Sequence, residues 1–221
     1  MCIAIYKPAG CEVTDLTLET CWQNNPDGMG FMYVKHNKIV IVKELKNFDR
    51  FLLKYEKAIK ANPECDFVLH FRIATSGIID LTNCHPFRIN QSLAFCHNGI
   101  IAIETKKHVN DTRMFMKQVL RRLPDNWLTK SAIRELVEYR IGQSKFIFLD
   151  SKGTVSILNA HMGLWDNGVW FSNHTYKETY FTKWGFDSDG NCEICSMPLL
   201  DGEIKYCEPC IEHYKDKDTW L

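Results

Sequence analysis

The order of the periodic apolar segments is the feature that most constrains the fold of this 221-residue chain. Short alternating or continuous apolar runs predict strands, and apolar residues spaced three and four apart predict helices. The expected strands are residues 2–7, 31–35, 38–43, 66–74, 93–97, 100–103, 145–149, 154–158 and 169–171. The expected helices are residues 15–25, 48–61, 111–123 and 131–141. Strands and helices do not alternate regularly, so we expect a layered α+β domain with largely antiparallel sheets and not a parallel doubly wound sheet.

Local motifs predict where several of these elements begin and end. Asp15 and Asn47 are expected to cap the helices that follow them. Gly142 is placed to end the helix over residues 131–141. His36-Asn37 joins two strand-like runs, which predicts a β-hairpin.

The distribution of the ten cysteines indicates the redox compartment. Six of them are scattered and four fall within the last thirty residues. This division favours a reducing cytoplasm and one metal site over a secreted disulfide framework. The chain has no run of eighteen apolar residues and no signal-peptide pattern at its start, so we expect a cytoplasmic protein with no membrane span.

The clustered cysteines predict a small C-terminal module that binds structural Zn²⁺. Cys192-x-x-Cys195 and Cys207-x-x-Cys210 are separated by eleven residues, the pattern of a zinc ribbon. The alternative is four free or disulfide-linked cysteines. We expect two domains, residues 1–185 and residues 186–221, and a metal that supplies most of the folding free energy of the second.

The charge of this module bears on its partners. Residues 186–221 contain nine acidic side chains and three lysines, so their net charge is −6, and the preceding residues carry the opposite excess. Because an acidic surface repels phosphate, nucleic acid is not the expected partner. A protein-docking element, or a lid on the basic first domain, fits the charge better.

Cys2 is the first candidate for catalysis. Removal of Met1 would leave Cys2 with a free α-amine and a thiol on one residue. An α-amine has a pKa of about 7.7–8.0 and can act as the base for a nucleophile on its own residue. The alternative is that Cys2 is an ordinary buried residue of the first strand.

Three other motifs each have a structural and a functional interpretation. Arg72 lies in an apolar run before a glycine-containing loop, where it could form an ion pair or bind a substrate carboxylate. Asn98-Gly99 lies between two strand-like runs and could make a hairpin turn or an oxyanion hole. Asn110, followed by Asp111 and Thr112, is a typical helix N-cap.

Taken together, these motifs resemble the class II glutamine amidotransferase (glutaminase) domain of the N-terminal-nucleophile hydrolases. The resemblance covers roughly residues 2–175 and implies a four-layer αββα sandwich. Its parts occur in the family's order: Cys2, Asp27-Gly28-Met29-Gly30, the His-x-Arg-x-Ala-Thr-x-Gly run at 70–77, Cys84-His85-Pro86-Phe87, His97-Asn98-Gly99-Ile100-Ile101 and Asp111-Thr112.

The resemblance implies a catalytic role for three residues. The Cys2 thiolate would attack the side-chain amide carbon of glutamine, and its own α-amine would take the thiol proton, through a water molecule. The side chain of Asn98 and the backbone N–H of Gly99 would stabilise the oxyanion. A thioester would form, ammonia would leave, and water would release glutamate.

The resemblance also implies three substrate-binding residues. Arg72 would bind the substrate α-carboxylate with Thr75 beside it, and Asp111 would bind the α-ammonium group. Two opposite charges at a fixed separation would select a free amino acid over a glutamine inside a peptide.

Some positions depart from the family pattern, and they leave the substrate open. Ile3, Ile73 and Ser76 stand where Gly, Trp and His are common. Relatives on this fold cleave other γ-glutamyl amides or N-acyl bonds, and a non-catalytic partner-binding protein on the same fold is a further alternative. The residues after the glutaminase part are too few for a synthase domain, so an ammonia acceptor would be a separate protein, or there is none. Bacteriophages also carry compact stand-alone proteins of this appearance.

Overall fold

The computed structural model describes residues 2–75 and 77–177, and its helices and strands follow the expected order. The strands are β1 (Ile3–Lys7), β2 (Met29–Lys35), β3 (Lys38–Glu44), β4 (Phe67–Phe71), β5 (Phe87–Arg88), β6 (Leu93–Asn98), β7 (Lys145–Asp150), β8 (Val155–Leu158), β9 (Leu164–Asp166) and β10 (Val169–Phe171). The α-helices are α1 (Asp15–Asn24), α2 (Phe48–Ala61), α3 (Asp111–Gln118) and α4 (Ser131–Ile141). Short 3₁₀ helices cover Leu120–Arg122, Trp127–Thr129 and Ala160–Met162.

Two antiparallel sheets form the centre of the described chain. The first has the strand order β3-β2-β4-β1-β10-β9, and the second has the order β5-β6-β7-β8. β1 pairs with β4 on one side and with β10 on the other. The strand that begins directly after Cys2 is therefore held in the middle of the first sheet.

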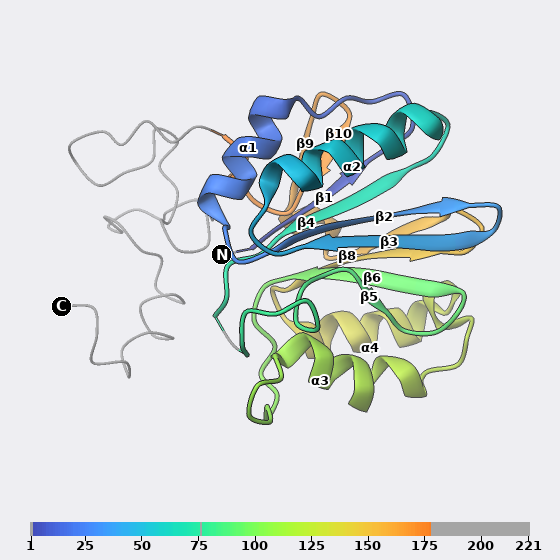
Figure 1. Cartoon of the computed structure of the whole chain (residues 1–221). Helices are drawn as coiled ribbons and strands as arrows, with labels where there is room; N and C mark the ends of the chain where they lie inside the picture. Colours follow the sequence, from blue (N-terminus) through green and yellow to red (C-terminus); the bar gives the residue numbers. More distant parts are fainter. Residues whose placement is uncertain (1, 76, 178–221) are drawn as a thin grey trace, which may run out of the picture.

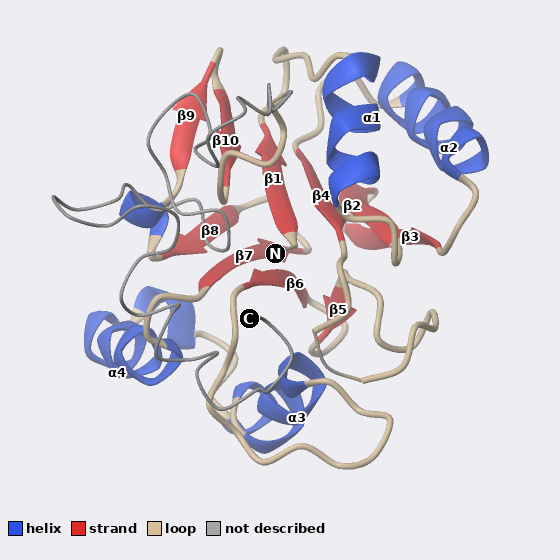
Figure 2. Ribbon diagram, turned by 90° about the vertical axis from the view of Figure 1, so that its left-hand side faces the viewer, coloured by secondary structure: helices blue, strands red, loops and turns tan. Residues whose placement is uncertain are grey.

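The two sheets face each other between two pairs of helices. Helices α1 and α2 cover the outer face of the first sheet, and α3 and α4 cover the outer face of the second (Figure 1). The turned view shows the same two helix pairs on opposite sides of the strands (Figure 2). Alternate residues of β4 divide between two cores, because Leu69 packs on the helix side and Val68 packs between the sheets. These observations confirm the expected α+β arrangement in layers.

Most of the expected elements are present, with small shifts at their ends. Helix α2 and helix α4 have the expected bounds, and Asn47 caps α2 by accepting the backbone N–H of Arg50 at 2.8 Å. The hairpin of β2 and β3 forms with Lys35 opposite Lys38. The expected strand at 66–74 ends at Phe71, so Arg72 follows β4 and is not part of it.

Three local expectations were wrong. The cap of α1 is Thr14 and not Asp15, because the Thr14 hydroxyl accepts the backbone N–H of Thr17 at 3.2 Å. Residues 100–103 form no strand, since the backbone N–H of Ile101 bonds to the side chain of Asp111 instead of to a neighbouring strand. The helix expected over 111–123 gives way to a 3₁₀ turn after Gln118.

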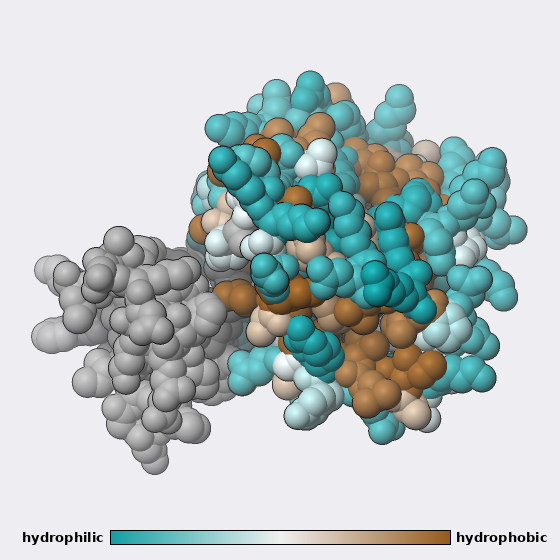
Figure 3. Space-filling model, turned by 90° about the horizontal axis from the view of Figure 1, so that it is seen from below, coloured by the Kyte–Doolittle hydropathy of each residue, from teal (hydrophilic) through white to brown (hydrophobic). Residues whose placement is uncertain are grey.

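Apolar surface remains on the side of α3 and α4. Leu136 and Tyr139 of α4 are 69% and 89% exposed. The space-filling view of this side shows apolar areas among hydrophilic side chains (Figure 3). In the part of the chain described here, no helix has both the length and the apolar character needed to cross a bilayer.

Candidate active site

Cys2 lies at the start of β1, beside the segment that follows β4. Because β1 pairs with β4 with Ile3 opposite Phe71, the residues before β1 and after β4 meet at the same end of the sheet. The Cys2 thiol donates to the backbone carbonyl of Ile73 at 3.3 Å. Burial raises the pKa of the Cys2 thiol, while Arg72 lowers this pKa and Asp111 raises it. The thiol is therefore within electrostatic reach of both charged candidates.

Arg72 is buried, and two backbone hydrogen bonds fix its position. Its N–H donates to the Gly28 carbonyl at 2.7 Å, and its carbonyl accepts the N–H of Asp27 at 2.8 Å. The guanidinium donates to the Ile78 carbonyl at 3.2 Å. Thr75, on the same segment, has an exposed side chain.

Asn98 and Gly99 end β6 and do not form a hairpin turn. Asn98 is fully buried, and its Nδ2 donates to the Ser172 hydroxyl at 2.8 Å. The same hydroxyl accepts the backbone N–H of Ala4 at 2.9 Å. Asn98 is thus connected through one serine to the strand that begins after Cys2. At Gly99, where φ is +134°, a side chain would collide with Ser144.

Asp111 begins helix α3 and is half-buried. Its Oδ2 accepts the N–H of Ile101 at 2.8 Å, and its Oδ1 accepts the N–H of Thr112 at 2.7 Å. Asn110 caps the helix by accepting the N–H of Arg113 at 2.9 Å, as its position before the helix indicated. Within the described residues, no lysine or arginine pairs with the Asp111 carboxylate.

A buried asparagine joins the Arg72 segment to the start of α3. Asn83 donates to the carbonyls of Ile78 and His108, at 3.1 and 2.9 Å. Its own side-chain oxygen accepts the N–H of Asn110 at 3.2 Å. Arg72 and Asn83 share the Ile78 carbonyl, so one polar network connects the Arg72 guanidinium to Asn110, the residue before Asp111.

Three buried histidines lie behind the candidate site. The rings of His70 and His85 stack at 4.0 Å, and His70 Nε2 bonds to the His97 carbonyl at 2.9 Å. Burial lowers the pKa of His70 to about 3 and that of His97 to about 4, and it lowers the pKa of His85 as well. The histidines are therefore neutral at pH 7. Over the described ranges, no group of three or more His, Cys, Asp or Glu side chains could hold a metal ion.

Sequence reasoning missed the residues that connect these candidates. Ser172 bridges Asn98 to β1, Asn83 connects the Arg72 segment to Asn110, and Asn173 Nδ2 donates to the Cys2 carbonyl at 2.9 Å. Asp27 accepts the N–H of Ala74 at 2.7 Å. The only hint was the position of Ser172 and Asn173 directly after an apolar strand. The predicted zinc ligands Cys192, Cys195, Cys207 and Cys210, and the boundary at residue 185, lie outside the described residues.

A separate depression of about 380 Å³ lies at the opposite end of β1. Lys7, Cys11, Tyr55 and Lys60 are among its lining residues. Because Lys7 is at the far end of the strand from Cys2, this depression does not belong to the candidate site.

Comparisons with known proteins bear on the fold. No protein-family model and no curated protein matches the sequence. A solved structure of glutamine phosphoribosylpyrophosphate (PRPP) amidotransferase from B. subtilis, complexed with ADP and GMP, is similar with a TM-score of 0.50 and 14% identity. A glutamine aminotransferase class-II domain protein from Silicibacter pomeroyi is 15% identical over 68% of this chain and 73% of its own, with a TM-score of 0.31.

The match to the B. subtilis enzyme is partial. It covers 77% of this chain, and this chain spans 41% of that protein. The described part of this chain therefore has the fold of a glutamine amidotransferase over the matched region.

Proposed function

We propose that this protein is an amidohydrolase that cleaves the side-chain amide of glutamine and uses Cys2, exposed by removal of Met1, as its nucleophile. The main support is the hydrogen-bonded path from Asn98 through Ser172 to Ala4, which brings an amide donor to the strand that begins after Cys2. If Cys2 and Asn98 only packed in a hydrophobic core, this hydrogen-bonded connection between their segments would not be needed.

The chemistry follows from the state of the thiol. Because burial raises its pKa, the Cys2 thiol is protonated at neutral pH and needs a base. The freed α-amine accepts the proton, and the thiolate attacks the amide carbon. One N–H of the Asn98 amide is donated to Ser172, and the second, together with the Gly99 N–H, stabilises the oxyanion. The protonated amine then gives its proton to the departing nitrogen, which leaves as ammonia. Water hydrolyses the thioester to release glutamate.

Two charged side chains bind the substrate in this proposal. Arg72, fixed by Gly28 and Asp27, binds the α-carboxylate with Thr75 at its exposed edge. Asp111, which has no cationic partner in the described chain, binds the α-ammonium group. Both side chains act electrostatically on the Cys2 thiol, so both lie in its neighbourhood, as the binding of one substrate by both requires.

The test is ammonia release from glutamine by protein whose intact mass shows that Met1 is gone. Cys2→Ala and a form with an uncleaved N-terminal extension should each lower release by about 10³-fold or more, since the nucleophile or its base is lost. Cys65→Ala is the matched control, because Cys65 is also partly buried and its thiol also bonds a backbone carbonyl, that of Val34 at 3.2 Å. Release that survives Cys2→Ala would end the proposal. Other γ-glutamyl and N-acyl amides belong in the same assay, and a clear preference for one of them would change the substrate.

We further propose that the ammonia passes to a separate acceptor protein. Ile78, Ile79, Leu81 and Ile100 are 40–48% exposed and belong to the two segments that border the candidate site. Exposed apolar side chains of this kind are a feature of docking surfaces. Affinity capture with the intact protein should recover an acceptor, and Leu81→Asp should weaken that capture without changing glutamine hydrolysis.

The zinc ribbon is also a proposal. Cys192, Cys195, Cys207 and Cys210 supply four thiolates, which is a complete tetrahedral set for Zn²⁺. Elemental analysis should find one zinc per chain, and Cys207→Ser should lose it. Full-length protein with no zinc after purification without chelators would contradict the ribbon.

A further inference from the structure

Among the described residues, only neutral donors hold Asp111, the residue proposed to bind the substrate's ammonium group. Its oxygens accept the backbone N–H groups of Ile101 and Thr112 and, at 3.3 Å, the hydroxyl of Thr112. The backbone contacts fix where the carboxylate lies. The hydroxyl is the only side chain in the described part of the chain that contacts it, so the hydroxyl's orientation affects which lone pairs remain for a ligand.

The orientation of the Thr112 hydroxyl depends on two neighbours. A carboxylate has no proton to donate, so in the contact with Asp111 the hydroxyl is the donor. Its oxygen is 2.7 Å from Nδ1 of His97, and it accepts a hydrogen bond there when the His97 proton is on Nδ1. Thr112 and His97 are both buried, and the other ring nitrogen of His97 has no partner among the described residues.

The histidine is well suited to hold this orientation. Burial lowers the pKa of His97 to about 4, so at neutral pH its ring carries one proton. The ring packs against Phe146 with centroids 4.8 Å apart, which limits its rotation. When the one proton of the His97 ring is on Nδ1, this N–H donates to the Thr112 oxygen and keeps the hydroxyl proton directed at Asp111.

We propose that His97 carries its proton on Nδ1 and that Thr112, oriented by it, is a positioning residue that fixes the Asp111 carboxylate for the α-ammonium group of the substrate. This inference rests on the proposed function. It assigns a role in substrate selection to a threonine and a histidine that touch neither the thiol nor the scissile amide.

The test compares two substrates that differ only at the α-carbon. Glutaramate is glutamine without its α-amino group, so the ratio of kcat/KM for glutamine to that for glutaramate measures recognition of the ammonium. Thr112→Val keeps the shape and removes the hydroxyl, and it should lower this ratio about five-fold, the effect of losing one net hydrogen bond. Thr112→Ser retains a hydroxyl and should keep the ratio near the wild-type value.

The control removes a buried threonine hydroxyl elsewhere. Thr20 in α1 donates to the Leu16 carbonyl at 2.8 Å and is likewise buried, so Thr20→Val should leave the ratio unchanged. An unchanged ratio in Thr112→Val, or a lowered ratio in Thr112→Ser, overturns the positioning role while the proposed function stands. A wild-type protein that releases no ammonia from glutamine overturns the proposed function and this inference with it.

A second measurement does not depend on activity. The ¹⁵N spectrum of the histidine side chains should show His97 protonated at Nδ1 and not at Nε2, and Thr112→Val should disturb this resonance. Protonation at Nε2 would reverse the direction of the Thr112 hydroxyl and overturn the inference.

Discussion

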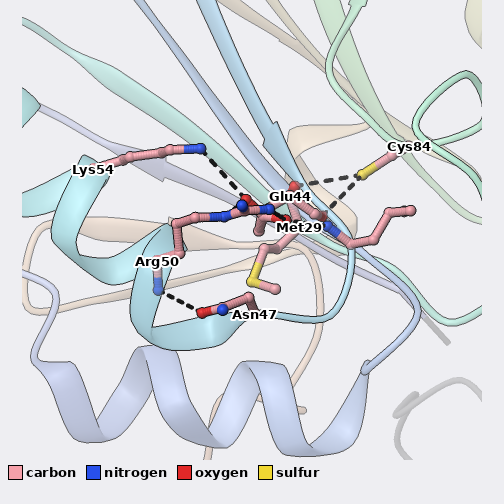
Figure 4. Close-up of polar contacts among 7 residues, drawn as sticks. Met29, Glu44, Asn47, Arg50, Lys54 and Cys84 are labelled. Carbon is pink, nitrogen blue, oxygen red and sulfur yellow. Dashed lines mark hydrogen bonds and ion pairs between the residues drawn. The ribbon is translucent and has the colours of Figure 1, made fainter.

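Two carboxylates in this protein have opposite surroundings. Glu44, at the end of β3, receives the guanidinium of Arg50 through two bonds of 2.5 and 2.6 Å and the ammonium of Lys54 at 3.4 Å (Figure 4). Its side chain is 7% exposed. From residues 2–75 and 77–177, Asp111, at the start of α3, receives only backbone N–H groups and one hydroxyl. The described residues neutralise the negative charge of Glu44 and leave that of Asp111 uncompensated.

The contrast extends to the groups around each carboxylate. Of the buried polar side-chain atoms without a partner in the described chain, five belong to Asn98 and to the three histidines His70, His85 and His97. None belongs to Glu44 or its partners. Unsatisfied buried groups cost stability and are kept where a ligand or a reaction uses them. The comparison therefore separates a structural ion pair from a site prepared for a charged ligand, and four predictions test this separation.

The largest expected effect is a loss of stability in acid, caused by the histidines. In the unfolded chain a histidine has a pKa near 6.5, whereas burial lowers the pKa of His70 to about 3 and of His97 to about 4 in the folded protein. As the pH falls, the unfolded chain therefore binds protons at a higher pH than the folded protein does. The stability present above pH 6.5 is lost as the pH falls from 6.5 towards the folded-state pKa values. Each histidine should account for about 2 kcal/mol between pH 7 and pH 5.

Urea denaturation at several pH values measures this loss. Burial also lowers the pKa of His85. Both of its ring nitrogens lack partners among the described residues, so His85→Phe removes no hydrogen bond there and should flatten the pH dependence. The exposed His161 is the control, and His161→Gln should leave the pH dependence as it is. A slope unaffected by His85→Phe would show that the buried histidines are not responsible.

The second effect concerns the uncompensated carboxylate itself. Asp111→Asn removes the charge but keeps the size, and kcat/KM for glutamine should fall about 100-fold or more because the substrate's ammonium loses its partner. The free energy of unfolding should change by only about 1 kcal/mol, since an Asn oxygen can still accept a backbone N–H. Steady-state kinetics and urea denaturation of the same preparation distinguish a substrate-binding role of Asp111 from a structural one. A large loss of stability with normal kinetics would make Asp111 structural, like Glu44.

The third effect concerns the serine that connects Asn98 to β1. Ser172→Ala leaves the Asn98 amide and the Ala4 N–H without their shared acceptor. We expect kcat to fall about 10-fold with KM unchanged, because a misplaced oxyanion donor affects the transition state more than the bound substrate. Ser156→Ala on β8 is the control. An increase in KM with normal kcat would assign Ser172 to substrate binding instead.

How far the sequence predicted these features depends on how local their cause is. Helix α2 was predicted with its cap because apolar spacing and Asn47 are local properties. Strand β5 was missed because two residues are too short to show a period. Strand β9 was missed because its sequence, Leu-Trp-Asp, is not a continuous apolar run like the equally short β10, Val-Trp-Phe. Residues 100–103 are apolar enough for a strand, but Asp111 takes the backbone N–H of Ile101, and no pattern within the segment reveals that.

The same distinction between local and non-local causes applies to the residues of the candidate site. Cys2, Arg72, Asn98 and Asp111 were found because they lie in recognisable motifs. Ser172 is a single serine 170 positions after Cys2. The pairing of β1 with β10 brings it to Ala4, and the packing of the second sheet on the first brings it to Asn98. The uncompensated charge of Asp111 is also a property of the folded surroundings, since its neighbours in sequence give no indication of which donors reach it.

The smallest effect concerns the neutralised carboxylate. Glu44→Gln removes the negative charge and leaves one oxygen instead of two to accept from Arg50. Since Arg50 is 60% exposed, the loss should be only about 1 kcal/mol in urea denaturation at pH 7. The Arg50 hydrogen bond holds the pKa of Glu44 below its usual value, so this contribution is present above the unfolded pKa and is lost as the pH falls through the folded one. The difference between wild type and Glu44→Gln should therefore shrink in acid. Glu138→Gln, which breaks the 3.8 Å pair with Arg134, should cost less than about 0.5 kcal/mol. Glutamine kinetics should be normal in both variants, and an increased KM in Glu44→Gln would mean that the two carboxylates are not separate in function.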